Sequence, residues 1–102
     1  MRGWGSPLVS VVVENHTSTA VGLVNLHISS CGATSSLSAR NIQPGTSHTF
    51  RFLVCGEGGY KLDAMLERNM VLSSGAYVES GYKVIESIGP FQIKSKYKNF
   101  PL

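Results

Sequence analysis

Apolar and polar residues alternate with a period of two along much of this sequence, and this alternation limits the chain to an all-β fold. Val9, Val11 and Val13 alternate with other residues near the N-terminus, and Phe50 and Phe52 repeat the pattern in the middle of the chain. Successive side chains of a β-strand point to opposite faces, so this spacing predicts strands with one buried face. No window of the sequence has the spacing of an amphipathic helix.

Turn residues divide the chain into short segments that we expect to be strands. Gln43-Pro44-Gly45-Thr46 predicts a type II turn, and Gly56-Glu57-Gly58-Gly59 predicts a hairpin loop. A bulge near Gly22 would bring Val21 and Leu23 to the core side of their strand. We expect strands over about 8–14, 20–29, 35–42 (short and weak), 47–55 and 60–67, two strands within 70–88 that break near 73–75 or at Gly81, and a last strand over about 91–98.

Together these segments predict a single antiparallel β-sandwich of about seven strands over residues 8–98, immunoglobulin-like or transthyretin-like, with a small barrel as the alternative. We expect residues 1–7 to form an N-terminal extension and residues 99–102 a C-terminal tail. The 102 residues suffice for one domain with one core. The predicted core consists of the inward-facing residues Val9, Val11, Val13, Val24, Leu26, Ile28, Phe50, Phe52, Val54, Tyr60, Leu62, Leu66, Val84 and Ile88.

Charge and hydropathy exclude some classes of protein. The net charge of +3 is mildly basic, short of what is typical of a nucleic-acid-binding module. No stretch approaches the roughly 20 apolar residues of a membrane-spanning helix. Residues 1–7 lack the apolar segment of a secretion signal, so the sequence leaves open a cytoplasmic protein or one whose signal has been removed.

Cys31 and Cys55 are the two cysteines, and each lies at the end of a predicted strand. In an up-and-down trace these two strands run in the same direction, so both sulfur atoms would lie at one end of the sandwich. A disulfide would close a loop of about 24 residues and stabilise the fold by roughly 3 kcal/mol. It would also indicate a periplasmic or secreted protein, whereas two free thiols would fit the cytoplasm.

The residues that usually carry catalysis or hold metals form no recognisable motif. His16, His27 and His48 lack the paired spacing of zinc ligands, and no histidine closely follows Cys55 as a blue-copper site requires. We therefore expect no metal, no cofactor and no enzymatic activity. A thiol- or metal-dependent enzyme that uses a cysteine with His27 or His48 stays open as a second alternative.

Lys94, Lys96 and Lys98 are the most suggestive surface feature. On a strand, alternate side chains project from one face about 6.7 Å apart, close to the repeat of a nucleic-acid backbone. Lysines on a terminal strand also prevent edge-to-edge pairing between sheets, which is the explanation that we favour. An unstructured basic tail is the third possibility.

Several short motifs occur in a familiar order: Val13 to Thr17, Gln43 to Ser47 before Phe50-Arg51-Phe52, Gly59-Tyr60, and Tyr77 to Tyr82. In this layout the chain resembles small uncharacterised bacterial β-sandwich proteins, some of them exported, over most of residues 9–88. The resemblance implies an immunoglobulin-like or transthyretin-like sandwich with no known activity and no catalytic residues.

The sequence therefore predicts a non-enzymatic binding or structural module that acts through a protein partner, by loop contacts or by adding a strand to a sheet edge. The first alternative is nucleic-acid or anionic-surface binding through the strand of Lys94, Lys96 and Lys98. No membrane span is expected, and the sequence is compatible with a monomer or a homodimer.

Overall fold

The structure, a computed structural model, describes residues 8–98, and the proposed extension (1–7) and tail (99–102) lie outside this range. The described residues form eight β-strands and one turn of 3-10 helix. The strands are β1 (Leu8–Asn15), β2 (Val21–Ser30), β3 (Ala33–Ile42), β4 (Ser47–Leu53), β5 (Glu57–Met65), β6 (Val71–Glu79), β7 (Lys83–Ile88) and β8 (Ile93–Tyr97), and the 3-10 helix η1 (Glu67–Asn69) lies between β5 and β6.

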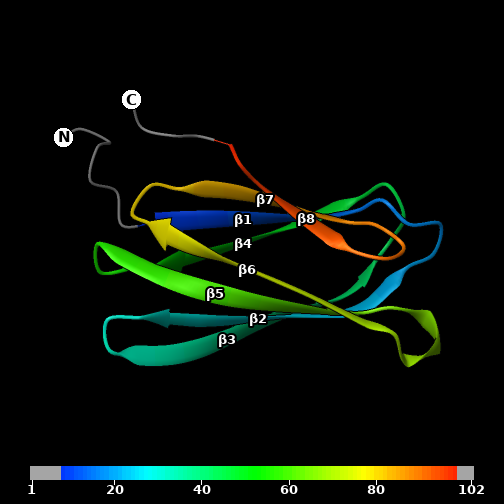
Figure 1. Cartoon of the computed structure of the whole chain (residues 1–102), viewed down its shortest axis with the longest axis horizontal. Coiled ribbons are helices and arrows are strands. Elements are labelled where there is room, and N and C mark those ends of the chain that lie inside the picture. The colour runs from blue at the N-terminus through cyan, green and yellow to red at the C-terminus, as the bar shows by residue number, and fades with distance from the viewer. Residues whose placement is uncertain (1–7, 99–102) are drawn as a thin grey trace.

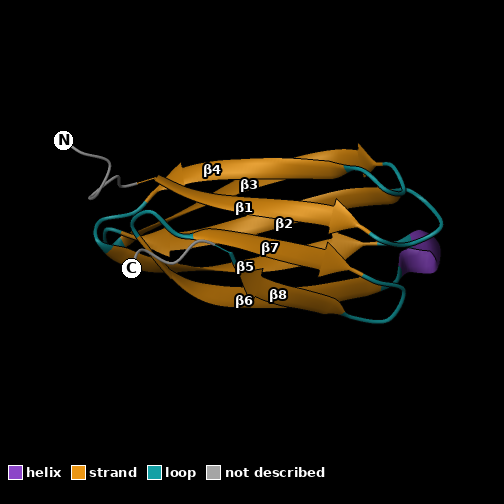
Figure 2. Cartoon of the chain, turned by 90° about the horizontal axis from the view of Figure 1, so that it is seen from above, coloured by secondary structure: helices purple, strands orange, loops and turns teal. Residues whose placement is uncertain are grey.

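The strands pack as two four-stranded sheets, in the orders β4-β1-β7-β8 and β3-β2-β5-β6 (Figure 1). The sequence therefore predicted the all-β class and the two-sheet arrangement correctly, although the described residues form eight strands rather than about seven. All strands follow the long axis of the molecule (Figure 2). The turn of η1 lies at the opposite end from the links between β2 and β3 and between β4 and β5.

One pair of strands is parallel, which corrects the prediction of a wholly antiparallel sandwich. β1 runs parallel to β7, with Val11 opposite Val84, whereas every other pair of neighbouring strands is antiparallel. The physical reason is the number of reversals along the chain. Each connection reverses the direction of the chain, and six of them separate β1 from β7, so these two strands point the same way when they become neighbours.

The segment Gly56–Gly59 is not a hairpin loop, contrary to the prediction. β4 pairs with β1 and β5 pairs with β2, so the chain passes from one sheet to the other between Leu53 and Glu57. Gly58 lies within β5, where a Cβ atom would come within 2.7 Å of the carbonyl oxygen of Ser29. The glycine is needed because the two backbones approach closely here. In the sequence, a glycine that serves this purpose looks the same as a glycine in a turn.

Other predicted boundaries agree with the structure in part. Gly45 has a φ of 76° and the Thr46 N–H donates to the Gln43 carbonyl at 3.1 Å, as the predicted type II turn requires. The strand expected to be short and weak is the ten-residue β3, and the break within 70–88 falls at Ser80-Gly81-Tyr82.

Val21 is fully buried, as the predicted bulge near Gly22 implies, whereas Leu23 is only half-buried. The register is the same on both sides of Gly22, because Val21 faces Ile42 and Leu23 faces Arg40. No extra residue is therefore inserted in either strand. Between Val21 and Val24 the parity of the buried residues nevertheless changes. This change coincides with a positive φ of 55° at Asn41, on the neighbouring strand β3.

Every residue of the predicted core is buried except Leu66, which is partly buried against it. The core also contains five residues that the prediction did not place there with certainty, namely Val21, Ala39, Ile42, Ala64 and Val78. Two polar residues, Asn15 and Glu86, are buried among these apolar side chains. Both must form hydrogen bonds there, because a buried polar group without a partner costs free energy.

Asn15 ends β1 and uses its whole side-chain amide. Its Nδ2 donates to the carbonyl oxygens of Thr19 and Ile42, each at 2.8 Å, and its Oδ1 accepts from the N–H and the hydroxyl of Thr17 at 2.9 and 2.7 Å. These four bonds fix the turn that carries the chain from β1 to β2 and attach this turn to the end of β3.

Glu86 lies on β7, where its carboxyl group points into the space between the sheets. Its Oε2 accepts from the Tyr60 hydroxyl, and its Oε1 lies 2.8 Å from the Ser74 Oγ and 2.7 Å from the Ser95 Oγ. Ser74 belongs to β6 and Ser95 to β8, so the group joins two edge strands of different sheets. Burial raises the pKa of Tyr60 well above its usual range, and the bond to Glu86 raises it further, so this phenol stays a donor.

Candidate functional site

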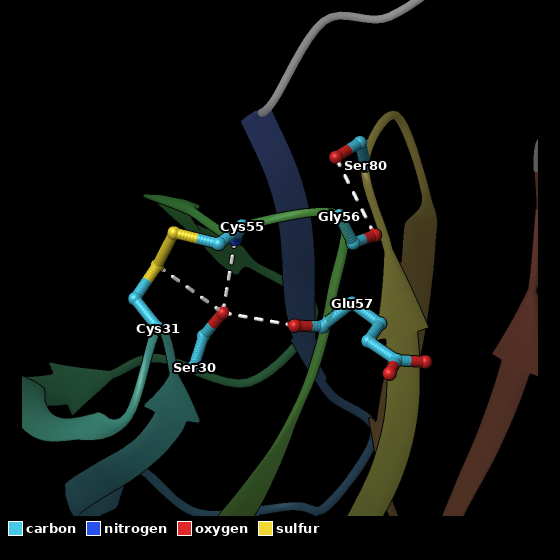
Figure 3. The surroundings of a disulfide bond; sticks show 6 residues. All are labelled: Ser30, Cys31, Cys55, Gly56, Glu57 and Ser80. Carbon is cyan, nitrogen blue, oxygen red and sulfur yellow. Dashed lines mark hydrogen bonds between the residues drawn. A yellow bond between two sulfur atoms is a disulfide. The ribbon is translucent and has the colours of Figure 1, made fainter.

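Cys31 and Cys55 are joined by a disulfide at one end of the sandwich (Figure 3). Their Cα atoms lie 5.2 Å apart, within the range of protein disulfides. Cys31 follows β2 and Cys55 follows β4, so the bond links the ends of the two sheets. The expectation that both sulfur atoms lie at one end is correct, because β2 and β4 run in the same direction.

Ser30 organises the backbone next to the disulfide. Its hydroxyl donates to the Glu57 carbonyl at 2.9 Å and accepts from the Cys55 N–H at 3.0 Å (Figure 3). Nearby, the Ser80 N–H donates to the Gly56 carbonyl at 3.0 Å. Both half-cystines are exposed. These contacts stabilise the crossing between the sheets, and no arrangement of a base beside a free thiol is present among residues 8–98.

Replacing both Cys31 and Cys55 with serine is expected to lower the free energy of unfolding by about 3 kcal/mol. The reason is that the disulfide limits the unfolded chain by closing a loop between residues 24 positions apart. Urea unfolding of the oxidised protein and of the double variant measures the difference. An equally stable double variant would show that the bond adds nothing to the fold.

Lys94 and Lys96 lie on β8, at the edge of its sheet, and Lys98 follows the strand directly. Lys94 is opposite Ser87 and Lys96 opposite Ile85, and the Lys98 N–H donates to the Lys83 carbonyl at 2.8 Å. This part of the chain is therefore held against β7 rather than forming an unstructured tail. The edge position agrees with the role of lysines in preventing sheet-to-sheet pairing.

The register places these lysines on the outer face of the β4-β1-β7-β8 sheet together with two more basic residues. Lys83 of β7 is next to Ser10 of β1, which in turn is next to Arg51 of β4. Alternate residues of each strand share this outer face, because their neighbours point into the core. We call this surface the basic face; its cationic side chains are Arg51, Lys83, Lys94, Lys96 and Lys98.

None of these five cationic groups forms an ion pair with any of residues 8–98. Glu14 is the acidic residue on the same face, and its carboxyl group already contacts His16 Nε2 at 2.9 Å and the Ser87 hydroxyl at 3.4 Å. The basic face therefore presents exposed positive charge that the described part of the protein does not neutralise.

The outer face of the other sheet has a different balance of charge. Arg40 and Lys61 lie there with three acids, Glu57, Asp63 and Glu79. Asp63 contacts the Ser73 hydroxyl at 2.6 Å and His27 Nε2 at 3.4 Å. The hydrogen bonds from Tyr77 to Glu79 and Glu57 raise the pKa of this tyrosine above its usual range. Charge is thus unequally divided between the two faces of the sandwich.

An apolar centre and an apolar hollow complete the basic face. Val12 and Ile85 are neighbours across β1 and β7 and are half-buried in its middle. At the end nearest the β7–β8 turn, a hollow of about 310 Å³ has Phe91, Ser87 and Lys94 among its walls. Phe91 is 81% exposed, the highest fraction of the exposed large apolar residues within 8–98. A partner could therefore place an apolar side chain here, next to Lys94.

The three histidines do not come together. His16 contacts Glu14, His27 contacts Ser36 and Asp63, and the ring of His48 packs against Phe50 at a centroid distance of 4.7 Å. Within residues 8–98 no three of the residues His, Cys, Asp and Glu are grouped as metal ligands. The same range contains no helix that is long and apolar enough to cross a membrane.

Sequence reasoning identified Lys94, Lys96 and Lys98 as a surface feature. It did not identify Lys83, Arg51 or Phe91 as parts of the same surface. The alternation did show that Lys83 and Arg51 face away from the core. What it lacked was the order of strands, because β4 and β7 are both neighbours of β1 only in the folded sheet. Comparison of the chain with protein-family models, with curated proteins and with solved structures finds no match.

Proposed function

We propose that this protein is a non-enzymatic binding module that holds an acidic protein partner against its basic face. The observation that carries the proposal is the gathering of five cationic side chains on one face of one sheet, none of them ion-paired with any of residues 8–98. Cationic groups arranged in this way attract an acidic surface from a distance and fix its orientation.

The apolar residues of the face favour a protein partner. Protein interfaces combine an apolar centre with a charged rim, and here Val12 and Ile85 lie among the cationic groups with Phe91 at one end. A nucleic acid would use the charges but would leave the half-buried aliphatic centre without a partner. Nucleic-acid or anionic-surface binding is therefore the second candidate, and the tests below distinguish the two.

The Cys31–Cys55 pair supports a periplasmic or secreted location as part of this proposal, because disulfides persist in oxidising compartments. We also propose that the sandwich is of the immunoglobulin-like or transthyretin-like type and that the protein is related to small bacterial β-sandwich proteins. The packing of two four-stranded sheets supports both parts of this proposal.

The test compares two variants that each lose two positive charges. Lys83→Gln with Lys96→Gln changes the basic face, and Arg40→Gln with Lys61→Gln changes the opposite face. The probe is a synthetic peptide rich in glutamate with interspersed leucine and phenylalanine, measured by calorimetric titration. We expect the first variant to bind about tenfold more weakly than the wild type and the second to bind unchanged.

Equal weakening in both variants would show that only the net charge matters and would contradict the proposal. A single-stranded oligothymidylate serves as the competitor at the same salt concentration. If it binds more tightly than the peptide and shows a steep salt dependence, the second candidate replaces the first.

A further inference from the structure

The two sheets have four edge strands, and two of these edges lie together. β8 and β6 end their respective sheets on the same side of the sandwich, where the Ser74 and Ser95 hydroxyls are 2.8 Å apart. The Tyr97 hydroxyl also donates to the Tyr77 carbonyl at 2.7 Å. β8 in addition carries Lys94 and Lys96. Contacts between the sheets and lysine charge therefore protect this side against another strand.

The opposite side is formed by the edges β4 and β3. β4 is seven residues long and carries His48 and the charged Arg51. β3 is ten residues long, and between Ala33 and Ala39 it contains no charged residue and no proline. All residues from Ala33 to Ser38 are exposed. β3 is thus a long edge strand that, from Ala33 to Ala39, has neither the charges nor the prolines that usually prevent pairing.

The backbone of this edge has groups available for pairing. In an antiparallel ladder only part of the N–H and carbonyl groups of an edge strand point to its neighbour, and the rest point outward. Among the described residues, no backbone group from Ala33 to Arg40 forms a backbone hydrogen bond outside the pairing with β2. Leu37, at the middle of the strand, is 37% exposed.

We propose that β3 pairs antiparallel with β3 of a second copy of this chain, so that the two β3-β2-β5-β6 sheets form one continuous sheet. The inference is independent of the partner proposed for the basic face, which lies on the other sheet of each copy. A two-fold dimer is the commonest symmetric assembly, and an edge strand satisfies its geometry by meeting itself.

The side chains of β3 select one register. In this register Leu37 of one copy lies opposite Leu37 of the second copy, so the two exposed leucines cover each other. Ser36 of each copy then lies opposite Ser38 of the other, and Arg40 lies opposite Thr34. Directly opposed residues have Cβ atoms about 4.5 to 5.5 Å apart, so like charges at opposed positions would weaken the pairing. In this register no two charged residues are opposed along 33–41. The absence of repulsion and the covered leucine favour a second copy over an unrelated extended segment.

The experiment uses two double variants at the same outward-facing positions. Ser36→Lys with Ser38→Lys places two lysine pairs in opposition across the proposed interface, whereas Ser36→Lys with Ser38→Glu places two lysine–glutamate pairs there. Both variants lose the contact between the Ser36 hydroxyl and His27 Nδ1 at 3.2 Å, so they are matched in that respect. Circular dichroism establishes that both are folded.

Sedimentation equilibrium over a wide range of concentration measures the dimer dissociation constant of the full chain. We expect the wild type to dimerise, the lysine–lysine variant to dimerise about tenfold more weakly, and the lysine–glutamate variant at least as tightly as the wild type. A wild type that is monomeric at every concentration would overturn the inference. Equal weakening in both variants would refute the proposed register.

Discussion

Replacing Asn15 with aspartate is expected to lower the free energy of unfolding at pH 7 by about 3 to 5 kcal/mol. The new carboxyl group keeps the acceptor that receives the two Thr17 bonds. Its other oxygen, however, would lie against the carbonyl oxygens of Thr19 and Ile42, which now receive the Nδ2 protons at 2.8 Å. That second oxygen of the buried carboxylate would therefore face two acceptors and no donor. Thermal and urea unfolding followed by circular dichroism measure the loss.

The pH dependence of this variant gives a second test. Burial against two carbonyl oxygens would raise the pKa of the introduced carboxyl group above its unfolded value of about 3.9. The folded state then holds its proton to higher pH than the unfolded state, so the stability difference from the wild type grows as pH rises above about 4 and shrinks below it. Gln92→Glu makes the same amide-to-acid change at an exposed site, and it should alter stability by at most about 0.5 kcal/mol. Equal effects of the two substitutions would argue against the buried network.

Replacing Glu86 with leucine is expected to cost about 2 to 3 kcal/mol of unfolding free energy. Leucine fills much of the same space but accepts no hydrogen bond, so the buried Tyr60 hydroxyl loses its partner. Ser74 and Ser95 also lose the carboxyl oxygen that they share between β6 and β8. Urea unfolding measures the cost, and increased amide hydrogen exchange in β8 would report the loosened edge.

The double variant Tyr60→Phe with Glu86→Leu separates the lost bond from a simple change of packing. Removing both partners takes away the unsatisfied hydroxyl, so the double variant should be more stable than Glu86→Leu alone. If the two substitutions instead destabilise additively, Glu86 and Tyr60 do not act as a pair, and the role assigned to the carboxyl group is wrong.

The two buried polar residues show how far the sequence could predict this fold. Alternation placed Val84 and Ile88 in the core, and Glu86 has the same parity as both. Its charge nevertheless argues for the surface unless its partners are known. Those partners come from β5, β6 and β8, and the order of strands that brings them together is not visible in a local pattern. Asn15 similarly looks like an ordinary turn residue until Ile42 is placed beside it.

The candidate surface was only partly predictable, because alternation is visible in the sequence whereas the order of strands is not. Outward-facing Lys94 and Lys96 follow from alternation within one strand, whereas the basic face needs the parallel pairing of β1 with β7, which brings Lys83 beside Ser10. The disulfide was easier to anticipate, since the direction of each strand follows from counting reversals and both cysteines follow strands of the same direction.

Mapping the acidic peptide by NMR tests the central claim, that the basic face is the binding surface. Amide shifts of the protein are followed while the glutamate-rich peptide is added, with the oligothymidylate in a parallel titration. We expect the largest changes at Val12, Lys83 and Ile85 and around Phe91, and little change at Asn25, His27 and Asp63 on the other outer face. Changes centred on the latter residues, or no saturable change on the basic face, would contradict the account.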